Sequence, residues 1–513
     1  MTPTPPETPI PQTVSELVSS LPGRLRPDKV VGWCACLHLR LSGAGVPEWT
    51  VRVADGRCEV APGLTGEPTC VVEMKGDTYV AIETGRTNPQ VAFMTGRVKV
   101  SNIAELMRFV KAFRPAGPAT EAGVRGPGSG QPGTDTSEHG LDLPLTGTTV
   151  LDLTRMLPGA VLARMLADFG ARVIKVEDPV GGDPLRHVPP LVGGVGAGFC
   201  TFYRGCSSLA LDLREPAGAV AVRRLVRRAD VLVESFRPGT LDGWDLGTER
   251  LRAINPSLVI CSLSGFGEAL PWRRRAAHDL NFAALSGLLS LLPGEGVPGV
   301  QVVDVSTGML ACSAILAALL RRQRTGRGAV VQQPLAAAPL PFVLWPWSDR
   351  AAGGVSIAET VLAGHCPAYR RYRCGDGLEL AVAALEPKLW VDLVTTMALP
   401  HLAGVGLDTG PTGERASVEL AAAFSGRDRT HWLALLGDLG LPVSPVNDLA
   451  TARDEELFST GGFLERTPMP GGSYLVTPGP FCGSLGATPG RPAPALGEHT
   501  DEILAELGDD VPA

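Results

Sequence analysis

The sequence predicts an α/β protein in two parts: a small α+β domain at the amino terminus and a large carboxyl-terminal domain built on a mostly parallel sheet. Three observations support this prediction. A segment rich in Gly, Pro, Ser and Thr divides the chain at residues 115–140 and is typical of a flexible linker. Before it, strand-like alternation lies between two helical stretches. After it, buried strands alternate with helices, which is the order of β-α-β units.

The small domain is expected to span residues 13–114. A helical stretch at residues 13–21 precedes three strand-like runs, VVGWCACLHLRL, EWTVRVADGRCEV and TCVVEMKG. A helix, IAELMRFVKAF, follows and carries its apolar residues on one face. The predicted order is therefore helix, meander and helix. No charged residue marks a reaction centre in this part of the sequence.

The large domain begins with a buried strand in TVLDLTRM, a helix in LARMLADFGA and a second strand in VIKVEDP. Together they form one β-α-β unit. The runs SLALDL, ADVLVESF and SLVICSLSGFG continue the alternation. A mostly parallel sheet flanked by helices follows from this pattern.

Composition excludes several classes of protein. The chain has 513 residues, 44% of them hydrophobic, and a net charge of −7, so we expect several cores and no dedicated nucleic-acid binding. The amino terminus has no signal-peptide pattern, and no run reaches the roughly 20 apolar residues of a transmembrane segment, which favours a cytoplasmic protein. The eleven cysteines form no CxxC pair, and no metal site is expected.

The segment GDTYVAIETGRTNPQVAFMTGRVKVSNIAELMRF resembles the sterol carrier protein type 2 domain. The Asn88–Pro89 turn, the MTGRVKV strand and the following helix carry this resemblance. It implies a curved sheet covered by helices around an apolar tunnel that holds a lipid or acyl chain. The other interpretation is that the apolar residues fill a small core, and the resemblance favours binding.

The segment LDLTRMLPGAVLARMLADFGARVIKVEDPVGGDPLR at residues 151–186 resembles the first unit of the class III CoA-transferase superfamily, of CaiB/BaiF type. LVESFRPGTLDGWDLG, NPSLVICSLSGFG, AILAALLRRQRTGRG, LPVSPVND and LGEHTDEIL support it. The resemblance implies an interlocked homodimer. It also implies a Rossmann-like large domain at residues 141–340, a small α/β domain at 341–480 and a segment at 481–513 that returns to the large domain.

One position separates the branches of this superfamily. In AHDLNFAALSG, His278 falls where α-methylacyl-CoA racemases carry the histidine of a GHD motif and transferases usually carry tyrosine. Asp304, in VVDVSTG, corresponds to the essential aspartate, and Glu386, in AVAALEPKLW, to the glutamate of the racemases' IEP motif. The resemblance implies that these three residues are catalytic and that Tyr369 and Asn281 bind the substrate.

The chemistry of a racemase explains this set of residues. Inverting the carbon next to a thioester carbonyl removes a proton from one face and returns one to the other, which requires two opposed acid/base groups. An imidazole with an ordinary pKa of about 6.5 and a carboxylate can serve in turn as base and acid. Glu386 would orient His278, and backbone N–H groups in the DVSTG glycine turn would stabilise the enolate. CoA is the carrier of the substrate, and no bound cofactor is expected.

The sequence departs from the superfamily at three places. The basic RGK(R/K)S stretch is Arg204, Gly205 and then Cys-Ser-Ser, so Arg204 and Arg237 remain as candidate contacts to the CoA phosphates. The asparagine four residues before the aspartate is Val300, and the GQ(V/I)D(V/A)S strand is GAVVQQPLA. These changes allow a substrate other than an ordinary fatty acyl-CoA.

The leading prediction is the epimerisation of a 2-methyl-branched acyl-CoA or related thioester, with the amino-terminal domain binding the hydrophobic acyl part. A CoA-transferase that moves CoA between carboxylic acids through an Asp304 acyl-enzyme is the first alternative. A repurposed enzyme of specialised metabolism and a non-catalytic acyl-lipid binding protein are the others.

Overall fold

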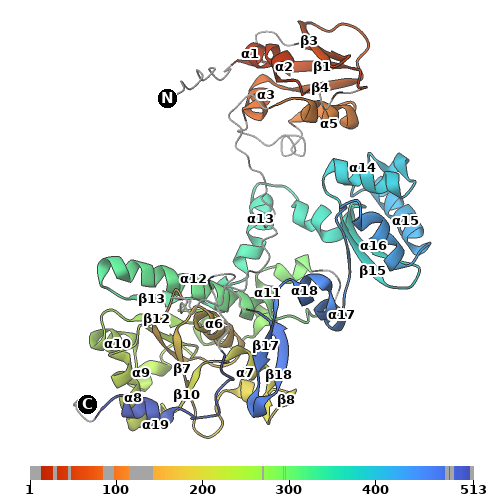
Figure 1. The fold of residues 1–513 in the computed structure, drawn as a ribbon. Helices are drawn as coiled ribbons and strands as arrows, with labels where there is room; N and C mark the ends of the chain where they lie inside the picture. Colours follow the sequence, from red (N-terminus) through yellow and green to blue (C-terminus); the bar gives the residue numbers. More distant parts are fainter. Residues whose placement is uncertain are drawn as a thin grey trace, which may run out of the picture. The chain divides into compact units, whose positions relative to one another are not determined.

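The chain divides into two compact units. The first comprises residues 1–136 and 364–446, and the second residues 137–363 and 447–513. Figure 1 labels the helices and strands of each unit. The predicted linker and the Asn88–Pro89 turn lie outside the described residues. The structure is a computed structural model that describes residues 13–26, 30, 32–43, 48–84, 97–114, 143–268, 271–292, 294, 296–479, 485 and 490–508.

The amino-terminal domain is a five-stranded sheet with helices packed on one face. Alternate residues of its central strand, such as Leu37 and Leu39, are buried in a core with Leu17, Tyr79 and Phe109 from the helices. The strand order is β3-β2-β1-β4-β5. The elements are α1 (Val14–Ser19), α2 (Leu21–Arg24), β1 (Ala35–Ser42), β2 (Glu48–Ala54), β3 (Arg57–Pro62), β4 (Cys70–Lys75), α3 (Gly76–Glu83), β5 (Val98–Val100) and α5 (Ile103–Ala112).

The predicted meander is correct only for β1, β2 and β3. Strand β4 lies on the other side of β1 and pairs with it in parallel. The connection to β4 crosses the outer face of the sheet, because Thr65 N–H donates to the Thr50 hydroxyl and the Thr65 carbonyl lies 3.3 Å from a ring nitrogen of His38. Strand alternation identifies strands but not their partners, which explains the difference.

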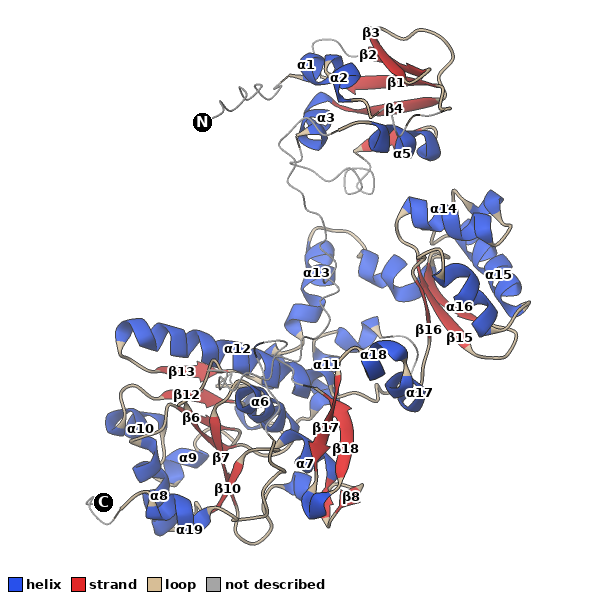
Figure 2. Ribbon diagram, in the orientation of Figure 1, coloured by secondary structure: helices blue, strands red, loops and turns tan. Residues whose placement is uncertain are grey.

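The large domain is a six-stranded parallel sheet in the order β10-β7-β6-β11-β12-β13, which confirms the predicted mostly parallel sheet. Helices cover both faces (Figure 2). In β6, Val150 packs in a core with Leu166 and Ile315, whereas Leu151 packs on the opposite face with Val222. The strands are β6 (Thr149–Leu153), β7 (Arg172–Glu177), β10 (Ser207–Ala210), β11 (Val231–Glu234), β12 (Val259–Ser262) and β13 (Ala329–Gln332).

Two helices on one face of this sheet pack unusually closely. A Cβ atom at Gly308 of α12 would lie 2.7 Å from the Pro158 carbonyl and 2.8 Å from Val161 of α6. Helix α12 is long and apolar enough to cross a membrane, but half of its most apolar window is buried here, as in a core helix. The helices are α6 (Leu157–Asp168), α7 (Ala197–Phe202), α8 (Pro216–Val226), α9 (Thr240–Gly243), α10 (Thr248–Ile254), α11 (Asp279–Leu285), α12 (Val302–Thr325), α13 (Leu340–Ala351) and α19 (Thr500–Ala505).

A small antiparallel sheet in the order β14-β15-β16 forms the rest of the first unit. Tyr372 stacks on Phe424, whose ring packs edge-on against Trp432. This part covers residues 364–446, a narrower range than the 341–480 expected. Its elements are β14 (Tyr369–Arg373), β15 (Glu379–Ala383), α14 (Pro387–Thr396), α15 (Pro411–Ser425), α16 (Arg429–Gly437) and β16 (Val443–Pro445).

The chain then adds two helices and a hairpin to the second unit. They are α17 (Leu449–Asp454), α18 (Glu456–Thr460), β17 (Leu464–Pro468) and β18 (Tyr474–Pro478).

Candidate active site

One cavity of the large domain brings together His278 and Asp304, the two acid/base residues predicted from the sequence. Its volume is about 270 Å³. It lies where two helices begin, since His278 immediately precedes α11 and Asp304 is in the first turn of α12. The lining residues are His278, Asp279, Leu280, Ala283, Leu288, Leu292, Val297, Pro298, Val300, Gln301, Val302 and Asp304.

His278 is exposed and is the N-cap residue of α11. Its backbone N–H donates to the Asn281 side-chain oxygen at 2.9 Å. Asn281 was predicted to bind the substrate, and in this structure its oxygen closes the first turn of the helix. The bond fixes the backbone that carries the imidazole.

The Asp304 carboxyl is partly buried, and its affinity for a proton is high. Burial, and after it the negative charge of Asp279, raise the pKa of Asp304, His278 lowers it, and the net value is about 6. The carboxyl can therefore hold or release a proton near neutral pH. That property suits a group that must act both as an acid and as a base.

The predicted glycine turn at DVSTG is wrong. These residues lie inside α12, and Gly308 serves the close contact with α6. The N–H groups of Val303 and Asp304 donate to Asp279 Oδ1, at 2.7 and 2.8 Å. These two backbone donors are therefore occupied by a carboxylate.

Most of the other residues that line the cavity are apolar. Val300, which replaces the polar residue expected four positions before the aspartate, lines the cavity and is exposed. Leu280, Leu288, Leu292 and Val297 line it as well. Among the described lining residues there is no lysine or arginine.

Arg204, a predicted phosphate contact, belongs instead to a buried ion-pair network. Its side chain is 1% exposed and pairs with Asp168 at 2.7 Å and with Glu465 at 3.1 Å. Arg164 of α6 pairs with the same two carboxylates. A guanidinium held this way joins α6 to strand β17 and does not face a phosphate, so the prediction for Arg204 is not supported by its environment.

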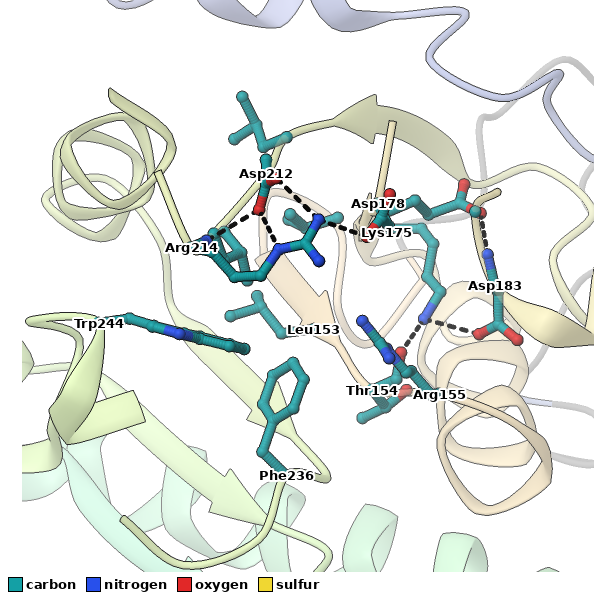
Figure 3. A pocket seen from close by; sticks show the side chains of 15 residues that line it. Leu153, Thr154, Arg155, Lys175, Asp178, Asp183, Asp212, Arg214, Phe236 and Trp244 are labelled. Carbon is teal, nitrogen blue, oxygen red and sulfur yellow. Dashed lines mark hydrogen bonds and ion pairs between the residues drawn. The ribbon is translucent and has the colours of Figure 1, made fainter. Parts of the chain in front are cut away.

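A crevice opens at the carboxyl ends of β6, β7, β10 and β11, where open parallel sheets usually bind ligands. The Phe236 and Trp244 rings meet edge-on at 5.1 Å on one side (Figure 3). Arg155 is exposed with its guanidinium 5.7 Å from the centre of the Phe236 ring, whereas Arg214 pairs with Asp212. Aromatic faces beside an exposed guanidinium can bind a phosphorylated base.

The family model described as CoA-transferase family III matches residues 145–500. The chain belongs to CoA-transferase family III. The model of the SCP-2 sterol transfer family matches residues 19–114. Both resemblances inferred from the sequence are thereby confirmed.

Relatives of this CoA-transferase family III enzyme include both racemases and CoA-transferases. It is 32% identical to the human α-methylacyl-CoA racemase over 71% of this chain and 94% of that protein. It is 31% identical to the mouse succinyl-CoA:glutarate CoA-transferase over 77% of this chain and 93% of that protein. A crystal structure of a CaiB/BaiF family protein from Brucella suis has a TM-score of 0.62 and 31% identity, covering 71% of this chain and all of that one.

In this family member, two further predicted site residues lie at one end of the small sheet. Tyr369 begins β14 and pairs with Ala383 of β15, and Glu386 follows shortly after as the exposed N-cap residue of α14. The Glu386 side chain makes no capping hydrogen bond. Its predicted role at His278 remains a prediction, as does that of Tyr369.

Sequence reasoning missed Asp279 and the crevice residues. Asp279 follows His278 directly, but only the fold places its carboxylate on α12. Arg155 could have been found, because it follows a buried strand that opens a β-α-β unit. Arg237 is exposed in the loop after β11, beside Phe236, and its predicted phosphate contact remains a prediction. No group of three or more potential ligand side chains among the described residues could hold a metal ion.

Proposed function

We propose that this enzyme epimerises a 2-methyl-branched acyl-CoA, with His278 and Asp304 as the two acid/base groups. The observation that carries the proposal is the cavity that holds both, in which burial raises the pKa of Asp304 to about 6. One group removes the α-proton and the other delivers a proton to the opposite face of the enolate. Glu386 and Tyr369 are proposed to complete the site.

The apolar lining of the cavity supports a hydrophobic acyl group. A dicarboxylic acyl group would bring its own free carboxylate beside Asp279 and Asp304. Among the described residues that line the cavity there is no lysine or arginine to pair with it. Burying an unpaired charge near two carboxylates is strongly unfavourable. Val300 likewise offers no hydrogen bond to a polar substituent. A branched, apolar acyl chain meets none of these costs.

A CoA-transferase is the second candidate, favoured by the identity to the glutarate transferase. The Asp304 carboxylate would attack the thioester carbonyl, form a mixed anhydride and release CoA thiolate. A carboxyl with a pKa of about 6 is largely ionised at pH 7.5, so its charge state does not oppose this step. The two candidates differ in the bond that breaks at the substrate: C–H at the α-carbon or C–S at the thioester.

We propose that the crevice at the carboxyl ends of the strands receives the nucleotide of CoA. Arg155 would contact phosphate and the rings of Phe236 and Trp244 would pack on the base. The amino-terminal domain would bind the hydrophobic acyl part, as its match to the SCP-2 family suggests. A cytoplasmic location is part of the same proposal.

The test is solvent exchange. We expect the purified chain in deuterium oxide to place deuterium at the α-carbon of a 2-methylacyl-CoA, which mass spectrometry detects. It should also convert either pure enantiomer to the mixture of both. Parallel samples contain a carboxylate acceptor and record any CoA transfer. Transfer without deuterium incorporation would establish the second candidate. The absence of both reactions would contradict both candidates.

A homodimer is a second prediction. Helix α13 exposes Phe342, Leu344, Trp345 and Trp347, a larger apolar surface than a free helix usually presents to water. We propose that a second copy covers this helix. Light scattering should give two chains per particle, and Trp345→Glu combined with Trp347→Glu should give one. A single chain per particle for the unaltered protein would contradict the dimer.

A further inference from the structure

The first turn of α12 is capped from another helix. Asp279, the first residue of α11, accepts the N–H groups of Val303 and Asp304 through one oxygen, at 2.7 and 2.8 Å. The local N-cap residue, Gln301, makes no side-chain capping bond. The free N–H groups and dipole at a helix start favour a carboxylate there. The bond between the two helices is therefore a charge-assisted one at a strongly preferred place.

This contact lies between the two groups that we propose for proton transfer. His278 is the residue before Asp279, and the N–H of Asp304 itself is one of the two donors. We propose that Asp279 is a positioning residue that fixes the separation of His278 and Asp304 and whose charge favours the protonated form of Asp304. This inference rests on the epimerisation proposed above and assigns it a residue beyond those that touch the substrate.

Asp279 acts on Asp304 through its negative charge as well as through its hydrogen bond to the Asp304 N–H. The titratable groups that line the cavity with Asp304 in the described residues are His278 and Asp279. Across the close contact of α12 with α6, the groups met are the Pro158 carbonyl and the Val161 side chain, neither of which titrates. The largest cause of the raised pKa of Asp304 is burial, and the second is the negative charge of Asp279. Neutralising Asp279 should therefore lower it.

Two substitutions separate geometry from charge. Asp279→Asn keeps an oxygen that can accept both N–H groups but removes the charge. We expect kcat at its optimum within about three-fold of the unaltered enzyme, and the limb of the kcat/KM profile set by Asp304 moved to lower pH. Asp279→Ala removes the acceptor as well, and we expect kcat to fall about 100-fold with KM changed little, because small displacements of catalytic groups cost that much.

A merely structural role would give a different result. Partial unfolding would lower the active fraction equally at every pH and would not move the profile of Asp279→Asn. Such a profile, unchanged in position, would overturn the charge effect. Equal kcat for Asp279→Ala and Asp279→Asn would overturn the positioning effect.

A titration without turnover separates this inference from the proposed reaction. Carbon NMR of chains labelled in the aspartate carboxyl groups, with Asp304 assigned from Asp304→Asn, should show Asp304 titrating near pH 6. In Asp279→Asn the same signal should titrate at lower pH. If the signal moves as expected but no substrate exchanges its α-proton, the proposed function fails and the pairing of Asp279 with Asp304 stands. If the signal does not move, the inference fails whatever the activity.

Discussion

Asp304→Asn should lower the rate of racemisation of a 2-methylacyl-CoA by about 100- to 10,000-fold, the usual contribution of a positioned acid/base group. The amide keeps the size of the carboxyl but can neither accept nor return the α-proton. Because Asn leaves the backbone of α12 in place, KM should change little. Chiral analysis of the product from each pure enantiomer gives the rate.

Proton exchange in the same variant distinguishes the two faces of the substrate. With only His278 left, we expect one enantiomer to exchange its α-proton with deuterium and to keep its configuration, because proton and deuteron pass on one face. The other enantiomer, whose proton points at position 304, should not exchange. His278→Ala should show the reverse preference. This reciprocal pattern is specific to two bases on opposite faces.

The control is Asp501→Asn, an exposed aspartate in the first turn of α19, which should leave both rates unchanged. Loss of exchange from both enantiomers in one variant, with exchange of both enantiomers kept in the other, would point to a single base. If the unaltered enzyme exchanges no α-proton but forms a CoA thioester at Asp304 from the substrate, the reaction is CoA transfer.

The position of Asp304 in the fold suits the proposed role, in which it acts as an acid for one enantiomer and as a base for the other. An ordinary aspartate, with a pKa of about 3.9, would lose its proton to an imidazole with a pKa of about 6.5. The return of the proton to the aspartate would then be unfavourable. Burial brings the pKa of Asp304 to about 6, close to that of an ordinary imidazole. In the proposed reaction, the active form would carry one proton for the pair of bases.

The parallel sheet, and the two residues that meet in the cavity of the large domain, were predictable from the sequence for different reasons. Strands that are buried on both faces are continuous apolar runs, and amphipathic helices lie between them, so runs such as VLV in ADVLVESF indicate the sheet. His278 and Asp304 were found by resemblance, and both line one cavity. The parallel pairing of β4 with β1 depends on a loop held by Thr50, which alternation does not encode.

Contacts between distant segments could not be predicted. The sequence RGCSS suggests that Arg204 is what remains of a basic patch. In the fold, Arg204 is buried and pairs with Asp168 and Glu465, which come from other segments of the chain. In the same way, nothing near Asp279 in the sequence indicates that its carboxylate caps α12. The predicted donors for an enolate failed because helix and turn cannot be distinguished in a motif as short as DVSTG.

The buried network around Arg204 leads to the second large effect. Asp168 is fully buried and lies 2.7 Å from Arg204 and 3.5 Å from Arg164, and Glu465 from strand β17 is the other carboxylate that pairs with them. Asp168→Asn would leave two buried guanidinium groups with one carboxylate. We expect a loss of about 3–5 kcal/mol in the unfolding free energy of the large domain. Its melting temperature should fall by on the order of 10 °C.

A matched substitution gives the comparison. Asp245 also pairs with an arginine, Arg223 at 2.8 Å, but its side chain is 62% exposed. Asp245→Asn should change the melting temperature by no more than about 2 °C, since exposed ion pairs contribute little. Replacing both members of the buried pair, in Asp168→Leu with Arg204→Met, should recover stability relative to Asp168→Asn, because apolar side chains of similar volume leave no unpaired charge. Equal melting temperatures for Asp168→Asn and Asp245→Asn would show that Arg204 is not held by this network and would restore it as a candidate contact for phosphate.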